Sequence, residues 1–95
     1  MISIIVALIF GSIGALLAAD FQTGFAAYQK GDYAAALREW TPLAEQGIAA
    51  AQYNLGLMYE KGQGVNQDDK TAVKWYALAA DQGYAKAQNN LGVMY

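Results

Sequence analysis

Residues 51–59 read AQYNLGLMY, and residues 87–95 read AQNNLGVMY. Seven of these nine positions are identical at an offset of 36 residues. The same offset relates WTPLAEQGIAAAQ, which begins at Trp40, to YALAADQGYAKAQ, which begins at Tyr76. A fixed period of this length is typical of a solenoid, in which similar supersecondary units stack along one axis.

Each unit is predicted to be a pair of helices. Ala51, Leu55 and Tyr59 are spaced at i, i+4 and i+8, which places them on one stripe of a first helix. Gly56 is predicted to mark a tight helix crossing, because an exposed glycine in mid-helix would only cost about 1 kcal/mol relative to alanine. The second helix has a close-packing face of mostly small residues: Ala72, Tyr76, Ala79, Ala80 and Gly83.

The residues between the helices agree with this division. Gly62 and Gly64 interrupt the chain after the first helix. Asp68 or Asp69 can cap the second helix and favour its positive end. Gly83 is predicted to end that helix, and the next helix begins at Ala85.

An earlier segment fits the same pattern as a shortened unit. Residues 25–28 align with residues 56–59, and the loop that follows them is five residues shorter. Its second helix is predicted over residues 33–46. Pro42 lies inside that helix and should kink it or split it after Trp40, because proline removes a backbone hydrogen bond.

The stretch LGLMYEKGQGV at residues 55–65, followed by an aspartate and KTAVKWYALAADQG at residues 70–83, resembles the Sel-one-like repeat. That family is related to the tetratricopeptide repeat and has a longer loop between its helices. The resemblance covers about residues 35–95, and it is weaker over residues 21–34. Thirteen positions carry it: Ala51, Leu55, Gly56, Tyr59, Gly62, Gly64, Val65, Ala72, Trp75, Tyr76, Ala79, Ala80 and Gly83.

This resemblance implies an all-α, right-handed superhelix of helix-turn-helix repeats behind an apolar N-terminal segment. We expect a shortened tetratricopeptide-like unit at residues 20–50, a complete Sel-one-like repeat at 51–86, and the first helix of an incomplete third repeat at 87–95. The last unit of a solenoid needs a polar cap, which LGVMY at residues 91–95 does not supply. We therefore expect a longer protein, or else a partner that covers this end.

Residues 1–19 contain no charged side chain. An apolar run at residues 4–10 is followed by small residues, which predicts a secretory signal peptide cleaved after Ala19 and a periplasmic or secreted protein. The segment lacks a basic start and has Leu17 at position −3, and about 20 apolar residues can also span a bilayer. A retained membrane anchor and a buried core helix therefore stay open.

The composition argues against catalysis. The chain has no cysteine and no histidine, so the usual nucleophile–base arrangements cannot be assembled. The loop at residues 62–67 lacks the third glycine of a dinucleotide fingerprint and the Lys-Ser or Lys-Thr pair of a phosphate loop. Asp68 and Asp69 have no third ligand at suitable spacing for a metal. We predict no enzymatic activity, cofactor or metal, and the scattered lysines predict no nucleic-acid binding.

The predicted binding surface follows from the first helix of each unit. If those helices line a concave face, Tyr53 and Leu57 form one contiguous patch at i and i+4, and an amphipathic tyrosine suits contact with a peptide. The alternative is that Tyr53 packs against the neighbouring unit, because such stripes are usually core. The full predicted groove is Ala50, Tyr53, Leu57, Glu60, Lys86, Asn89 and Val93.

The resemblance implies an adaptor, so the predicted function is an exported scaffold that binds a protein or peptide partner. The alternative is a structural spacer in a larger exported enzyme or glycan-binding protein. A membrane-tethered adaptor would follow if residues 1–19 were retained.

Overall fold

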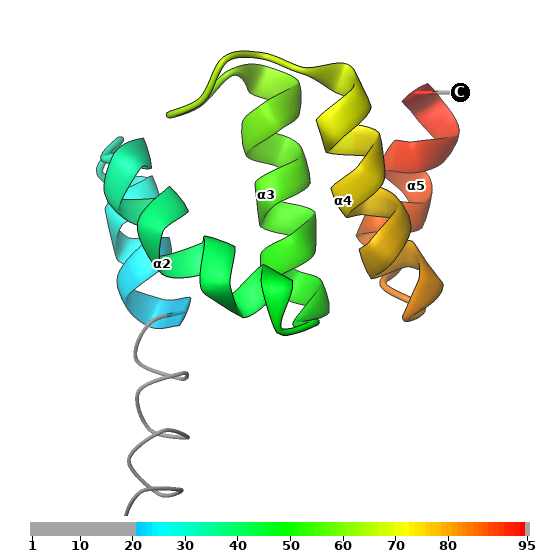
Figure 1. Cartoon of the computed structure of the whole chain (residues 1–95), viewed down its shortest axis with the longest axis horizontal. Coiled ribbons are helices and arrows are strands. Elements are labelled where there is room, and N and C mark those ends of the chain that lie inside the picture. Colours follow the sequence, from blue (N-terminus) through cyan, green and yellow to red (C-terminus); the bar gives the residue numbers. More distant parts are fainter. Residues whose placement is uncertain (1–20, 95) are drawn as a thin grey trace, which may run out of the picture.

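A computed structural model of the protein describes residues 21–94. They form five helices: a helical segment at residues 21–29, then α2 (Tyr33–Glu45), α3 (Ala49–Lys61), α4 (Asp69–Asp81) and α5 (Ala85–Met94). Figure 1 shows α3 and α4 running antiparallel, with α2 and α5 on either side of this pair. The predicted all-α architecture of sequential helix-turn-helix pairs is thereby confirmed.

The predicted signal peptide or anchor, residues 1–19, lies outside the described residues. Among the helices at residues 21–94, none combines the length and the apolar character needed to span a bilayer.

The 36-residue period recurs in the packing. Every buried residue of a second core has a counterpart 36 positions earlier in a first core, so the two helix pairs bury the same positions. Helix α3 contributes to both, which makes the stack continuous. The first core is Ala36, Trp40, Leu43, Ala44, Ala51, Leu55 and Met58, and the second core is Ala72, Tyr76, Ala79 and Ala87.

Two glycines allow the helices of each pair to cross closely. A Cβ atom on Gly56 would lie 2.5 Å from Cδ1 of Tyr76, and a Cβ atom on Gly24 would lie 2.5 Å from Nε1 of Trp40. The tight crossing predicted at Gly56 is therefore confirmed. The alignment of Phe25 with Gly56 is wrong by one residue, because Gly24 occupies the equivalent place and the first unit is shorter by four residues.

The predicted helix ends are found in α4. Of the two candidate caps it is Asp68 that precedes the helix and accepts hydrogen bonds from the backbone amides of Lys70 and Thr71 at 3.1 and 3.3 Å. Asp69 is the first residue of the helix. Gly83 follows the helix with φ of +85°, as expected for a glycine that ends it.

Pro42 does not split α2, which runs unbroken from Tyr33 to Glu45. Figure 1 shows a bend in its ribbon, consistent with the alternative of a kink. Proline cannot donate to the carbonyl oxygen of Arg38 in the preceding turn, but Pro42 lies three residues before the end of the helix and its side chain is exposed. The helix therefore tolerates the proline one turn from its end.

A repeated glutamine joins successive pairs. Gln52 Nε2 donates to the carbonyl oxygen of Ala44, and Gln88 Nε2 donates to that of Ala80, both at 3.1 Å. Gln52 is buried, and its Oε1 accepts a hydrogen bond from Gln82 Nε2 at 3.0 Å. The start of each first helix is thereby fastened to the end of the preceding second helix.

Candidate functional site

A small apolar hollow lies where the helical segment at residues 21–29, α2 and α3 meet. Its volume is about 150 Å³, which matches an apolar cavity able to hold one benzene-sized group. Phe25 is 45 % exposed at this place, so the hollow is accessible. We call it the aromatic hollow, and its lining residues are Phe25, Tyr28, Trp40, Asn54 and Leu57.

Aromatic side chains that line this hollow are held in place by hydrogen bonds and ring contacts with neighbouring residues. Trp40 Nε1 donates to the carbonyl oxygen of Phe21 at 3.1 Å. The ring of Tyr28 lies 5.7 Å from that of Trp40, between centroids, and its hydroxyl donates to Gln63 Oε1 at 2.8 Å. Because rings fixed in this way lose little freedom on binding, they can form a preorganised contact surface.

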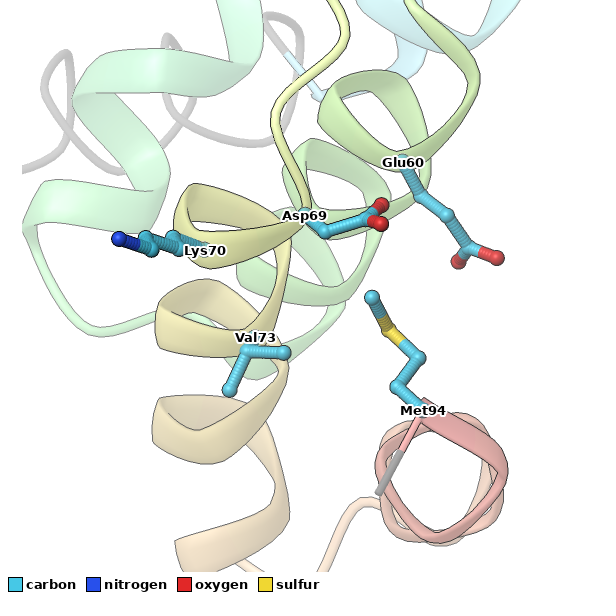
Figure 2. A pocket seen from close by; sticks show the side chains of 5 residues that line it. All are labelled: Glu60, Asp69, Lys70, Val73 and Met94. Carbon is cyan, nitrogen blue, oxygen red and sulfur yellow. The ribbon is translucent and has the colours of Figure 1, made fainter.

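A second hollow of about 440 Å³ lies between the end of α3, the start of α4 and the end of α5. Figure 2 shows the carboxylates of Asp69 and Glu60 turned toward the same space, with Met94 extending toward it and Lys70 pointing away. We call it the acidic hollow, and its lining residues are Glu60, Asp69, Lys70, Val73 and Met94.

Neutral donors hold both carboxylates of the acidic hollow. The hydroxyl of Tyr76 donates to Glu60 Oε1 at 2.6 Å and accepts from Asn90 Nδ2 at 3.3 Å. Gln67 Nε2 donates to Asp69 Oδ1 at 2.6 Å. Burial, followed by the hydrogen bond to Glu60, raises the pKa of Tyr76 far above its ordinary value, so this phenol remains a donor at pH values at which an exposed tyrosine ionises.

The predicted groove residues of α3 lie in different environments. Tyr53 is half-buried; its ring lies 5.8 Å from that of Tyr76 and 5.3 Å, edge-on, from that of Tyr84. Tyr53 and Leu57 both pack against the second core, and Leu57 also lines the aromatic hollow. Glu60 lines the acidic hollow, and Ala50 is half-buried.

The predicted groove residues of α5 are on the surface. Lys86 and Asn89 are exposed, and Val93 is 87 % exposed. None of the three lines either hollow. Helix α3 therefore brings Tyr53, Leu57 and Glu60 into packed surroundings, whereas the α5 positions lie open to solvent.

Four residues of the aromatic hollow were missed by the sequence analysis. Trp40 is 2 % exposed and belongs to the first core, although it also lines the hollow. The one-residue error in the alignment of Phe25 concealed that it corresponds to the predicted groove residue Leu57. With Gly24 matched to Gly56, the sequence alone would have paired these two positions.

Across residues 21–94, no three acidic side chains gather closely enough to hold a metal ion. Each buried side-chain nitrogen or oxygen in this part of the chain has a hydrogen-bond partner. The aromatic hollow presents aromatic and aliphatic side chains, and the acidic hollow presents two carboxylates.

Stacked helix pairs with a recurrent core and a recurrent inter-pair glutamine define a helical-repeat protein of the tetratricopeptide-like class. The family model of the Sel1 repeat matches residues 49–84 and 85–95. The chain belongs to the Sel1 repeat proteins.

The chain is similar to two proteins of known structure or role. The chain is similar to a crystal structure of a Sel1 repeat protein from Oxalobacter formigenes, with a TM-score of 0.74 and 42 % identity, over 82 % of this chain and 34 % of that one. It is also 39 % identical over 57 residues to an exopolysaccharide production negative regulator of Rhizobium leguminosarum bv. viciae. That match covers 60 % of this chain but 21 % of the regulator, so the chain spans about a fifth of its curated relative.

Proposed function

We propose that this protein is an exported, non-catalytic scaffold that binds a protein or peptide partner. The partner would lie across the first helices of successive units. One of its apolar side chains would enter the aromatic hollow, and its chain would continue past Leu57 and Glu60 toward the exposed residues of α5.

The aromatic hollow is the observation that carries this proposal. Energetically dominant interface contacts concentrate where an aromatic or aliphatic anchor fills a preformed pocket. The surface of the hollow is almost wholly apolar; its lining includes the 45 % exposed Phe25 and one amide side chain, that of Asn54. Apolar pockets with a few polar groups are the usual form of a binding site.

Membership of the Sel1 repeat family supports a protein partner, since stacked helical repeats create extended binding surfaces. The relative from Rhizobium is named as a negative regulator, and regulation through protein contact is compatible with a scaffold. Export rests on the apolar residues 1–19. N-terminal sequencing of the mature protein tests it, with a start at Asp20 supporting cleavage and an intact segment in the membrane fraction supporting an anchor.

The binding proposal can be tested with a random peptide library displayed on phage. Peptides selected on the wild-type protein should share a large apolar residue. Their affinity, measured by isothermal titration calorimetry, should fall at least about tenfold when Phe25→Ala removes the rim of the hollow, because truncating an anchor contact typically costs more than 1 kcal/mol.

Leu78→Ala is the matched control, because Leu78 is 40 % exposed on α4 and lines neither hollow. Its affinity for the same peptides should be unchanged. Equal losses in the two variants would remove the aromatic hollow from the proposal. A library that yields no peptide would favour the alternative of a structural spacer.

A further inference from the structure

The loop at residues 62–68 is fastened to the helix that precedes it at both of its ends. The backbone amide of Gln63 donates to the carbonyl oxygen of Met58, and that of Asp68 donates to the carbonyl oxygen of Tyr59, each at 2.9 Å. The loop therefore leaves α3 and returns to its last turn before α4 begins. Its middle part projects away from its own helix pair.

The projecting part reaches the preceding helix pair, as Figure 1 shows near the start of α2. Gln63 Oε1 accepts a hydrogen bond from the hydroxyl of Tyr28 at 2.8 Å, across 35 residues of sequence. A Cβ atom on Gly64 would lie 3.0 Å from Cβ of Tyr33 and 3.1 Å from its carbonyl oxygen. Gly64 also has φ of +76°. Both the close contact with Tyr33 and the positive φ therefore disfavour a side chain at this position.

These contacts bear on the aromatic hollow. Tyr28 forms one wall of it, whereas Asn54 and Leu57 form another from α3. We propose that the 62–68 loop is a strap, which holds the helix pair at residues 21–45 against α3 and thereby sets the width of the aromatic hollow. Gln63 and Gly64 are positioning residues, acting through Tyr28 and Tyr33.

The strap should act locally. The first core, with Trp40 and Leu55 among its buried residues, joins α2 to α3 independently of the loop. Loss of one partly buried hydrogen bond changes an opening equilibrium by roughly fivefold. Releasing the strap should therefore let the first pair open more often at its outer end, while α4 and α5 keep their packing.

Trp40 supplies a reporter for this opening, because it lines the hollow and the chain has two tryptophans. In a Trp75→Phe background, fluorescence reports on Trp40 alone. Tyr28→Phe, Gln63→Ala and Gly64→Ala should each increase acrylamide quenching of Trp40. They should also speed amide hydrogen exchange at residues 21–45 by roughly fivefold. The double variant Tyr28→Phe, Gln63→Ala should match the single variants, because both remove the same hydrogen bond.

Gln67→Ala is the control, since Gln67 belongs to the loop but bonds Asp69 instead of the preceding pair; it should change neither readout. Unchanged quenching and exchange in all three strap variants would overturn the proposal, as would an equal acceleration throughout α5, which indicates general destabilisation. If Gly64→Ala does not fold, Tyr28→Phe decides, because it deletes one oxygen atom. All measurements use the protein alone, so they are independent of the proposed binding function.

Discussion

Gly56 of α3 lies directly against the ring of Tyr76 on α4, so closely that a Cβ atom on the glycine would be 2.5 Å from Cδ1 of the ring. The same relationship joins Gly24 to Trp40 in the preceding pair. A large aromatic residue on the second helix is thus accommodated by the missing side chain on the first. Because both aromatic rings are buried, this fit fixes the spacing of the helices in each pair.

Gly56→Ala should lower the free energy of unfolding by about 1–3 kcal/mol, the usual cost of overpacking a core. Gly92→Ala is the matched control: Gly92 is the repeat counterpart of Gly56, but nothing lies within 4 Å of the Cβ position on it. It should gain at most about 1 kcal/mol from helix propensity. Urea unfolding followed by circular dichroism measures both, and similar values for the pair would contradict the close-contact explanation.

Gln52→Ala should cost about 1–2 kcal/mol of unfolding free energy, because a buried side chain loses its hydrogen bonds to Ala44 and Gln82. Gln88→Ala removes the equivalent bond to Ala80 but at an exposed position, where most substitutions change stability by less than about 0.5 kcal/mol. Thermal unfolding of the two variants distinguishes them. A larger effect at Gln88 would show that burial does not determine the strength of this junction.

Tyr76→Phe should destabilise the protein by about 1–2 kcal/mol, because the hydroxyl bonds Glu60 and Asn90. The pKa of Tyr76 in the folded state is raised above 10.0, first by burial and then by the Glu60 hydrogen bond. The unfolded chain therefore loses this proton first as pH rises above 10, and the contribution of the phenol to stability declines from there. Absorbance titration should show one tyrosine that resists ionisation in the wild type, and its persistence in the variant would contradict the assignment.

Asp68→Ala should lower the melting temperature at neutral pH through loss of the α4 cap. The hydroxyl of Thr71, followed by its backbone amide, holds the pKa of Asp68 below its ordinary 3.8. The carboxylate's contribution is therefore complete above about pH 4 and is lost as the pH falls through the lower folded-state value. The difference between wild type and variant should shrink in acid. Asp69→Ala removes no cap bond, so its effect on the melting temperature should not follow this pH dependence. A pH-independent effect of Asp68→Ala would argue against a charged cap.

The period of 36 residues was sufficient to predict the helix pairs, the crossing at Gly56 and the end at Gly83, because each depends on local chemistry or on the repeat itself. The choice between Asp68 and Asp69 required backbone geometry. The alignment of Phe25 failed because the shortened loop removed the register that the two later units share. A split of α2 at Pro42 was one of two predicted outcomes. It does not occur, because Pro42 lies near the end of the helix, where the loss of one backbone hydrogen bond is tolerated.

The candidate site was less accessible from the sequence. The surroundings of Tyr53 depend on where Tyr84 lies in the following turn, 31 positions away, and no helical pattern encodes that. The contact between Tyr28 and Gln63 likewise joins two loop-proximal residues of different units. Repetition predicts which positions are equivalent, but each hollow is formed by residues from three elements.

The junction glutamines have a consequence for how such a chain can change in length. Gln52 and Gln88 bind the ends of the helices just before them, and their partners are displaced by the same 36 residues. Each of these bonds spans eight residues of sequence. An insertion or deletion of one whole unit therefore restores the contact at the new boundary, whereas a change of length within those eight residues would place the glutamine opposite another carbonyl. Repeat proteins of this kind are therefore expected to lengthen by whole units of about 36 residues. Smaller changes in length are expected in the loops, such as the short loop before α2.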